Sequence, residues 1–195
     1  YRLVDAYTDP PQSSSSQSKT TLSAPYTVES LIHLKNFLCY TPCPYGQQSS
    51  LFDYKIEVSS APFLSSTPHS SAPIITFGTF NNYAKITDRV ISVWSHILHC
   101  VPNSRLVLKS KPFDCPRIKA LVLSKFEHLG IHASRIDLLG LVANHQQHLA
   151  SYSLLDISLD TFPYAGTTTT CEALYMGVPT IMLIPMDKKS KHYQL

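Results

Sequence analysis

The sequence predicts an α/β fold, a Rossmann-like parallel sheet with helices on both faces. From residue 73 onward, short apolar runs alternate with segments whose apolar residues recur at helical spacing. Turn residues separate these segments, and a helix fits between successive strands, which is the pattern of βαβ units. Strands buried on both faces carry nearly continuous apolar runs of this kind. The predicted strands are Ile74–Phe80, Arg105–Leu108, Arg135–Val142, Leu154–Leu159 and Thr180–Ile184.

Capping residues and apolar spacing locate the helices between these strands. Thr87 is the expected N-cap of a helix that runs to about Cys100. Gly130 ends a second helix, which begins at Asp114 or Cys115. A third helix covers roughly Gln146–Leu155, and a fourth covers Cys171–Met176. The apolar faces of the first two are predicted to be Val90, Ile91, Trp94, Ile97 and Leu98, and Ile118, Leu121, Val122, Lys125 and Leu129.

The first 72 residues do not show this alternation. Gln12–Thr21 is a serine-rich tract that cannot bury a core, and Phe37–Tyr40 is a candidate strand. Residues 46–72 are rich in Ser and Pro, which is typical of a connector. We therefore expect three parts: 1–45, with a serine-rich insertion at 12–24; the connector 46–72; and a Rossmann-like domain at 73–195.

Composition excludes several classes of protein. The net charge of +3 and the pI near 8.6 are too weakly basic to predict a nucleic-acid partner. Five cysteines form no CxxC pair, which favours reduced thiols in an intracellular protein. No apolar run approaches membrane-spanning length, and no segment resembles a signal peptide. Because the chain begins at Tyr1 without a methionine, we expect a piece of a larger protein.

The segment Ser158–Glu172 is the most informative in the chain. It passes from a strand through Gly166 to four consecutive threonines, Thr167–Thr170, at the start of a helix. Free N–H groups and the helix dipole favour an anion there, and a phosphate-bearing ligand is the natural candidate. The alternative is simple capping, since Thr169-x-x-Glu172 fits a capping box. Capping leaves Gly166 and the first two threonines unexplained. Glu172 could close that box or accept hydrogen bonds from ribose hydroxyls.

Other polar residues are expected at the same edge of the sheet. Lys85 follows the first strand of the Rossmann-like domain, with Asn82 in the same loop. Lys85 is either a surface charge or a group that neutralises a leaving phosphate. His148 follows the strand at 135–142 and could stack on a base or bond to a phosphate. His145 and His148 have a metal-ligand spacing, but no cysteine or carboxylate lies near them in the sequence.

The glycine pattern argues against two common nucleotide-binding classes. No two of the six glycines are spaced as in G-x-G-x-x-G or a Walker A loop, which disfavours a dehydrogenase-type domain. No D-x-D motif follows a predicted strand, so the sequence gives no reason to expect a metal that bridges a diphosphate. Phosphate binding here would depend on hydroxyl groups and a helix end.

These motifs together resemble the catalytic region of the SPINDLY proteins. The SPINDLY proteins are relatives of the nucleocytoplasmic O-linked N-acetylglucosamine transferases, in glycosyltransferase family 41. The resemblance covers residues 73–184 strongly, and Met186–Leu195 does not resemble the family's continuation. The motifs that carry it are Phe77–Ile86, Trp94–Leu98, Val101–Ser104, Asp156–Glu172 and Leu174–Pro179.

The resemblance implies the C-terminal, donor-binding half of a GT-B glycosyltransferase, incomplete at its C-terminus, with residues 1–45 as the end of the first catalytic half. It implies an inverting, metal-independent transfer of a sugar from a nucleotide donor to Ser or Thr of proteins in the nucleus and cytoplasm. Protein acceptors would bind through tetratricopeptide repeats, without nucleic acid, membrane or cofactor. SPINDLY members use GDP-fucose and the wider family uses UDP-N-acetylglucosamine; the form of the threonine run favours fucose.

The resemblance also assigns roles to individual residues. Lys85 would be catalytic and would stabilise the departing diphosphate, whose oxygens Thr167, Thr168 and Thr169 would hold. Glu172 would bind the ribose and His148 the nucleotide. Asn82 and Ala143 would complete the donor site. Because half of the cleft is missing, this piece alone is expected to be inactive. The alternative is a catalytically inactive nucleotide-binding or regulatory fragment.

Overall fold

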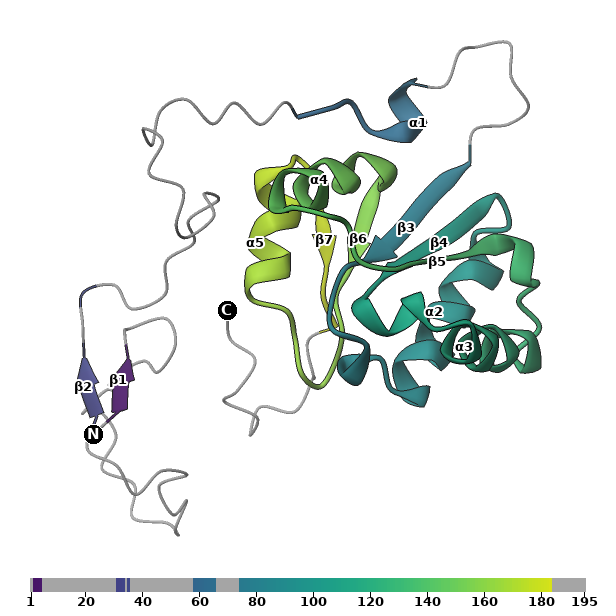
Figure 1. The fold of residues 1–195 in the computed structure, drawn as a ribbon, viewed down its shortest axis with the longest axis horizontal. Coiled ribbons are helices and arrows are strands. Elements are labelled where there is room, and N and C mark those ends of the chain that lie inside the picture. The colour runs from purple at the N-terminus through teal and green to yellow at the C-terminus, as the bar shows by residue number, and fades with distance from the viewer. Residues whose placement is uncertain (1, 5–30, 34, 36–57, 66–73, 184–195) are drawn as a thin grey trace, which may run out of the picture. The chain divides into compact units, whose positions relative to one another are not determined.

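The computed structural model describes residues 2–4, 31–33, 35, 58–65 and 74–183 (Figure 1). These residues fall into two units. The first contains β1 (Arg2–Val4) and β2 (Leu31–His33), which pair in parallel. The second contains the described residues from 58 to 183. The predicted strand Phe37–Tyr40, the serine-rich tract and most of the connector lie outside the described residues.

The second unit is built on a five-stranded parallel sheet, as the sequence predicts (Figure 1). The strand order is β5-β4-β3-β6-β7, so β3 is central. In the register, Phe77 of β3 lies between Leu106 of β4 and Ile157 of β6. The strands are β3 (Ile75–Thr79), β4 (Ser104–Lys109), β5 (Ile136–Leu139), β6 (Ile157–Leu159) and β7 (Thr180–Ile181).

Among the described residues, five helices and four 3₁₀ turns accompany the strands. Thr87 is the N-cap of α2 as predicted, and its hydroxyl accepts a hydrogen bond from the Val90 N–H at 3.3 Å. Gly130 follows α3 with a φ of +78°, a conformation that favours glycine. The helices are α1 (Pro62–Ser65), α2 (Asp88–Cys100), α3 (Pro116–His128), α4 (His145–Ala150) and α5 (Thr168–Tyr175). The 3₁₀ turns are η1 (Tyr83–Lys85), η2 (Lys111–Asp114), η3 (Ala133–Arg135) and η4 (Ser151–Leu154).

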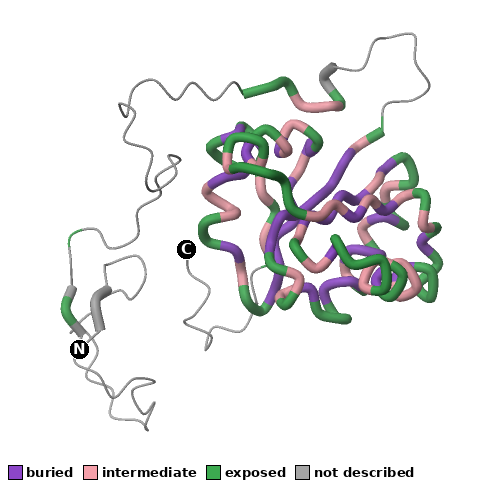
Figure 2. The backbone as a smooth tube through the Cα atoms, in the orientation of Figure 1, coloured by how far each residue is buried: buried purple, intermediate pink, exposed green. Residues whose placement is uncertain are grey.

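The core lies on both faces of the sheet, and β4 shows why. Successive side chains of a strand point to opposite faces. Leu106 and Leu108 therefore pack in the cluster that α2 and α3 cover, whereas Val107 packs in the cluster that α4, η4 and α5 cover. The buried stretch of the sheet runs through the middle of the unit in Figure 2. The sequence prediction of a sheet covered on both faces is confirmed.

Several predicted boundaries differ from the structure. The predicted strand at 135–142 ends at Leu139 as β5, and the predicted strand at 180–184 is β7, Thr180–Ile181. The third predicted helix is shorter, because α4 ends at Ala150 and the chain tightens into η4. As Leu154 belongs to that turn, β6 begins only at Ile157. On α3, Leu121 and Leu129 are exposed, and Val122 and Phe126 form the buried face.

The fourth predicted helix also starts earlier than its sequence suggests. α5 begins at Thr168, not at Cys171, so three threonines lie in its first turn. β-Branched residues are weak helix formers, and local propensity places the start too late. A tertiary hydrogen bond stabilises this first turn, since the Thr169 hydroxyl donates to Asn81 Oδ1 at 2.9 Å.

The strand order creates a topological switch point. The chain passes from β3 outward to β4 and β5, and then returns to the opposite side of β3 as β6. In open α/β sheets, ligands bind outside the carboxyl ends of the strands at such a point. The loops after β3 and β6 therefore flank the expected ligand position.

Candidate functional site

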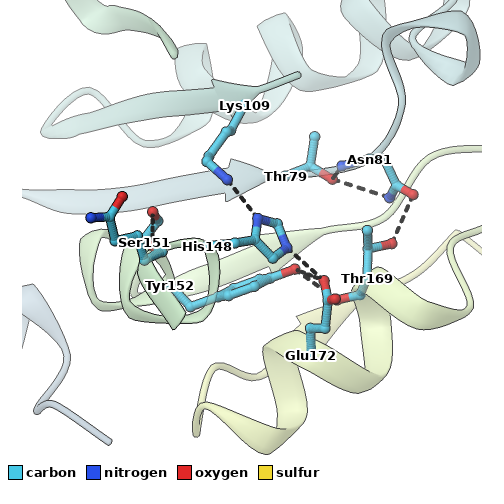
Figure 3. A network of polar contacts seen from close by, with 9 residues as sticks. Thr79, Asn81, Lys109, His148, Ser151, Tyr152, Thr169 and Glu172 are labelled. Carbon is cyan, nitrogen blue, oxygen red and sulfur yellow. Dashed lines mark hydrogen bonds and ion pairs between the residues drawn. The ribbon is translucent and has the colours of Figure 1, made fainter. Parts of the chain in front are cut away.

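Polar side chains gather at the carboxyl edge of the sheet, where β3, β4 and β6 end. The predicted residues Asn82, Lys85, Ala143 and Thr167 lie in or directly after the loops of this edge, and His148, Thr168, Thr169 and Glu172 lie on the helices that follow. Figure 3 shows side chains from β3, β4, α4, η4 and α5 meeting in one network. The structure thus brings together residues from separate parts of the sequence.

Glu172 is the centre of the network. It is buried, with a relative exposure of 6%, and its Oε2 accepts two hydrogen bonds. His148 Nε2 lies 2.9 Å from that oxygen, and the Tyr152 hydroxyl donates to it at 3.0 Å (Figure 3). On the other side of the imidazole ring, Lys109 Nζ lies 2.5 Å from His148 Nδ1. Lys109, His148 and Glu172 therefore form a continuous chain from β4 to α5.

This network has electrostatic consequences. Burial pushes the pKa of Glu172 upward, but the hydrogen bonds from His148 and Tyr152 and the electrostatic attraction of the His148 and His145 imidazole groups outweigh it. The pKa of Glu172 is therefore below its usual value, and the carboxylate is charged at neutral pH. Burial lowers the pKa of Lys109, and the nearby charge of Glu172 partly opposes that shift.

Aromatic rings form the apolar side of this network. The Phe80 and Tyr152 ring centroids are 4.4 Å apart, and the ring of His148 lies 5.9 Å from that of Phe80. The ammonium of Lys109 lies 5.1 Å from the Phe80 centroid, within the range of a cation–π contact. The His148 ring also lies 5.7 Å from that of Tyr152, so Phe80 and Tyr152 restrict its orientation from two sides.

A second network links the loop after β3 to the loop after β6. Asp160 Oδ1 accepts hydrogen bonds from Asn81 Nδ2 at 3.0 Å and from the backbone N–H groups of Thr161 and Gly166, both at 2.7 Å. Asn81 in turn accepts the hydrogen bond from Thr169. Asp160 and Asn81 are buried, with exposures of 4% and 3%. This network fixes the loop that leads into α5.

Gly166 is explained by close packing within that network. A Cβ atom at this position would lie 2.6 Å from Thr169 Oγ1, 2.8 Å from Thr170 Oγ1 and 3.1 Å from Asn81 Oδ1. Any larger residue would push the hydroxyl groups away from the loop. The glycine lets the loop lie directly against the start of α5.

Lys85 lies beside the same loop. Its Nζ donates to the carbonyl oxygen of Ala165 at 3.0 Å and lies 4.4 Å from the centroid of the Tyr164 ring. Partial burial lowers the pKa of Lys85, and the negative charge of Asp160 opposes that shift. The structure therefore places this ammonium close to the start of the threonine run, as expected from its position after β3.

The remaining predicted residues lie at the rim. Asn82 is exposed, and its side chain accepts a hydrogen bond from the Ala84 N–H at 3.0 Å, which caps η1. The exposed Ala143 donates its backbone N–H to Gln147 Oε1 at 3.2 Å. Thr167 is the N-cap of α5 but makes no side-chain capping bond, and Thr168 is exposed.

The capping-box alternative does not hold in the structure. Thr169 lies inside α5 and directs its hydroxyl to Asn81, and Glu172 faces His148 and Tyr152. Neither side chain caps the helix N-terminus. The first-turn N–H groups of α5 are consequently not capped by these two residues, which keeps them open to an anion.

Sequence reasoning missed several residues of the site. Lys109 carried a usable signal, because a charged residue in the last position of a buried apolar strand is unusual. Asp160 also stands directly after a strand, and it organises the loop from 160 to 166 through hydrogen bonds to both ends of that loop. The other missed residues, Phe80, Asn81 and Tyr152, had no such signal.

In the described part of the chain, no group of three or more His, Cys, Asp or Glu side chains could hold a metal ion. Within the same residues, no helix is long and apolar enough to cross a membrane.

The fold and the site define a Rossmann-like domain of the kind that forms the C-terminal half of GT-B glycosyltransferases. The model of the family described as "Glycosyl transferase family 41" matches residues 56–191. This chain belongs to glycosyltransferase family 41. The match extends beyond Met186, so the expectation that the resemblance ends before that residue is wrong for residues 186–191.

Individual relatives agree with this assignment. The chain is 47% identical over 184 residues to the probable UDP-N-acetylglucosamine–peptide N-acetylglucosaminyltransferase SPINDLY of Arabidopsis thaliana, covering 94% of this chain and 17% of that protein. It is 30% identical to the corresponding protein SEC of the same plant, over 82% of this chain and 15% of that protein. A solved structure of a Thermobaculum terrenum O-GlcNAc transferase mutant matches 63% of this chain and 24% of that one, with a TM-score of 0.55 and 34% identity. The chain thus spans about a sixth of the SPINDLY relatives' length.

Proposed function

We propose that this chain is the donor-binding half of a SPINDLY-type protein O-glycosyltransferase. The whole enzyme transfers a sugar from a nucleotide donor to Ser or Thr of proteins, inverting the anomeric centre without a metal ion. GDP-fucose is favoured over UDP-N-acetylglucosamine as the donor. The enzyme works in the nucleus and cytoplasm and reaches its protein acceptors through tetratricopeptide repeats that lie outside this chain.

One observation carries the proposal. Lys85, His148, and the threonine run with Glu172 belong to three separate elements, η1, α4 and α5, and they all lie at the carboxyl edge, next to the switch point of the sheet. A nucleotide diphosphate requires groups of these kinds. It needs a cation and free N–H groups for the phosphate oxygens, and a carboxylate acceptor for the ribose hydroxyls.

Each residue then has a role that fits its environment. The open first turn of α5 holds the diphosphate oxygens with the exposed hydroxyls of Thr167 and Thr168. Thr169 anchors this turn through Asn81. Lys85, 3.0 Å from the Ala165 carbonyl oxygen, lies close enough to neutralise charge on the departing diphosphate.

The remaining residues bind the nucleoside. Both hydrogen bonds that the Glu172 carboxylate accepts within the described part of the chain end on Oε2, so its Oε1 is the acceptor for a ribose hydroxyl. His148 holds Glu172 in place and contacts the nucleotide. Asn82 and Ala143, at the exposed rim, contact the sugar and the base.

Calorimetry on this chain tests the binding half of the proposal. GDP and UDP are titrated separately into the folded protein, together with GMP to isolate the contribution of the second phosphate. We expect binding of GDP and a clear loss of affinity for GMP. A folded sample that binds neither diphosphate would contradict the proposed function.

The full-length protein tests the donor and the reaction. GDP-fucose and UDP-N-acetylglucosamine are compared side by side, with hydrolysis and transfer to protein as readouts. Turnover of GDP-fucose alone would support the favoured donor. Nucleotide binding without turnover of either donor would favour the alternative, a catalytically inactive nucleotide-binding or regulatory protein.

A further inference from the structure

Lys109 is buried at the end of β4, which is an unusual environment for a lysine side chain. Its relative exposure is 4%, and lysine is among the residues least often found fully buried. Its ammonium contacts His148 Nδ1 at 2.5 Å and lies 5.1 Å from the centroid of Phe80. Removing an ammonium from water is costly, and apolar packing would have suited this position better. Since the side chain is almost inaccessible, Lys109 is poorly placed to bind a ligand itself.

We propose that Lys109 is a positioning residue that fixes the ring orientation and tautomer of His148 and thereby holds the Glu172 carboxylate toward a ribose hydroxyl of the donor. This inference rests on the proposed function, since it concerns the same nucleotide site. Lys109 acts through His148, and His148 acts on Glu172.

The hydrogen-bond chemistry supports this order. An ammonium has three donors and no lone pair, so His148 Nδ1 must accept the hydrogen bond from Lys109. The ring proton then lies on Nε2, which donates to Glu172 Oε2 at 2.9 Å. The Tyr152 hydroxyl donates to the same oxygen at 3.0 Å. Two donors on Oε2 fix the plane of the carboxylate and direct Oε1 away from them.

Without Lys109, the imidazole would lose this constraint. The ring could then take the other tautomer, in which a bare Nε2 faces the carboxylate oxygen and repels it. Four side chains face His148 from the elements around it: Lys109 on β4, Glu172 on α5, Tyr152 on η4 and His145 on its own helix α4. Of these, Lys109 bonds to Nδ1 and Glu172 bonds to Nε2.

A double-mutant cycle in the full-length enzyme tests the inference. Lys109→Met keeps the length of the side chain and removes its ammonium, and His148→Gln removes the residue through which it acts. We expect Lys109→Met to raise the donor KM about tenfold with kcat changed much less, as for other residues that orient a ligand-binding group. His148→Gln should raise KM similarly, and the double variant should be no worse than either single variant.

The split between KM and kcat supplies a readout that a merely structural role would not move. A partly unfolded variant would lose turnover with an unchanged donor KM, whereas a displaced Glu172 carboxylate raises the donor KM. Circular dichroism and the thermal midpoint check that each variant is folded. His148→Gln measures the same Glu172 contact if Lys109→Met does not fold.

The outcomes separate this inference from the proposed function. Additive losses in the double variant, or an unchanged KM in Lys109→Met, would overturn the role of Lys109 while wild-type nucleotide binding remained. So would a His148→Gln variant with a wild-type KM. A wild-type protein that binds no nucleotide would instead contradict the proposed function, and this inference with it.

Discussion

Both edges of the five-stranded sheet hold buried or partly buried charged side chains, but these side chains have different hydrogen-bond partners at the two edges. At the amino edge, charged side chains bond mainly to backbone groups. At the carboxyl edge, they bond to one another across several elements. Both edges belong to the same strands, so the contrast separates what holds the fold together from what forms the site.

Asp156 and Arg135 represent the amino edge. Asp156 Oδ1 accepts from the Phe63 N–H and its Oδ2 from the Thr76 N–H, each at 2.7 Å. Arg135 donates to three carbonyl oxygens between the end of α2 and the start of β4, at 2.9 to 3.0 Å: those of Leu98, Val101 and Ser104. Backbone groups cannot be exchanged for a ligand, so these contacts stabilise the connections between elements.

Lys109, His148 and Glu172 represent the carboxyl edge. Each of these side chains depends on another side chain for its position, and the hydrogen bonds that Glu172 accepts from described residues both end on Oε2. Such an arrangement is costly for stability but presents oriented polar groups to a ligand. The comparison therefore predicts that changes at the carboxyl edge affect binding and catalysis, and that changes at the amino edge affect stability.

The largest expected effect is that of Lys85→Ala on sugar transfer in the full-length enzyme. Removing a group that stabilises developing charge typically lowers kcat by a factor of about 100 to 1000. Lys125→Ala is the matched control, because Lys125 lies on α3 in an ion pair with Asp88 at 2.6 Å. It should leave transfer unchanged. Wild-type turnover by Lys85→Ala would contradict the catalytic role.

Asp156→Ala should produce the largest loss of stability. The change leaves the buried backbone N–H of Thr76 without its acceptor, at a cost of about 1–3 kcal/mol, and also removes the acceptor of the part-buried Phe63 N–H, which costs less. We expect the free energy of unfolding, measured with urea, to fall by about 3 kcal/mol. The nucleotide affinity of the folded fraction should not change.

Asp137→Ala is the control for that prediction. Asp137 forms an ion pair with Arg105 in which both side chains are about 40% exposed (41% and 39%). Exposed ion pairs contribute roughly 0–1 kcal/mol, so this carboxylate should matter far less than Asp156. Equal losses for the two variants would refute the view that backbone bonding at the amino edge stabilises the fold.

Glu172→Gln should change how stability depends on pH. Because the pKa of Glu172 is lowered in the folded state, its ionised form stabilises the protein above the unfolded pKa, about 4.3. That contribution is lost as pH falls through the lower, folded-state pKa. The difference in unfolding free energy between wild type and Glu172→Gln should therefore shrink as pH is lowered from 5 toward 3. Parallel curves would show that the network does not depend on the charge of Glu172.

The sequence was sufficient to predict the sheet and the edge of the sheet at which the candidate residues lie. The apolar runs, the N-cap Thr87 and the stop at Gly130 are local signals, and local contacts decide them. The order of strands and helices then places every loop residue after a strand at the carboxyl edge. This is why the sequence alone predicts that Lys85 and the threonine run lie close together, and in the structure Lys85 contacts the loop that leads into that run.

The hydrogen bonds between side chains of the site could not be predicted in the same way. Lys109 meets His148 across 39 residues, and Asn81 meets Asp160 across 79. The spacing of apolar residues carries no information about such pairs, since they depend on how the strands are ordered. The start of α5 was placed too late for the same reason: the hydrogen bond from Thr169 to Asn81 spans 88 residues.

The smallest expected effects distinguish two neighbouring threonines. Thr169→Val keeps the shape of the side chain and removes the hydrogen bond to Asn81, so it should lower the unfolding free energy by about 1 kcal/mol. Thr168→Val alters an exposed side chain and should change stability by less than about 0.5 kcal/mol. If the Thr168 hydroxyl holds a phosphate oxygen, GDP affinity should nevertheless fall severalfold in that variant. Urea unfolding and calorimetry on the same two proteins measure both effects. Thr168→Val with wild-type affinity would remove Thr168 from the site and leave the anchoring role of Thr169 intact.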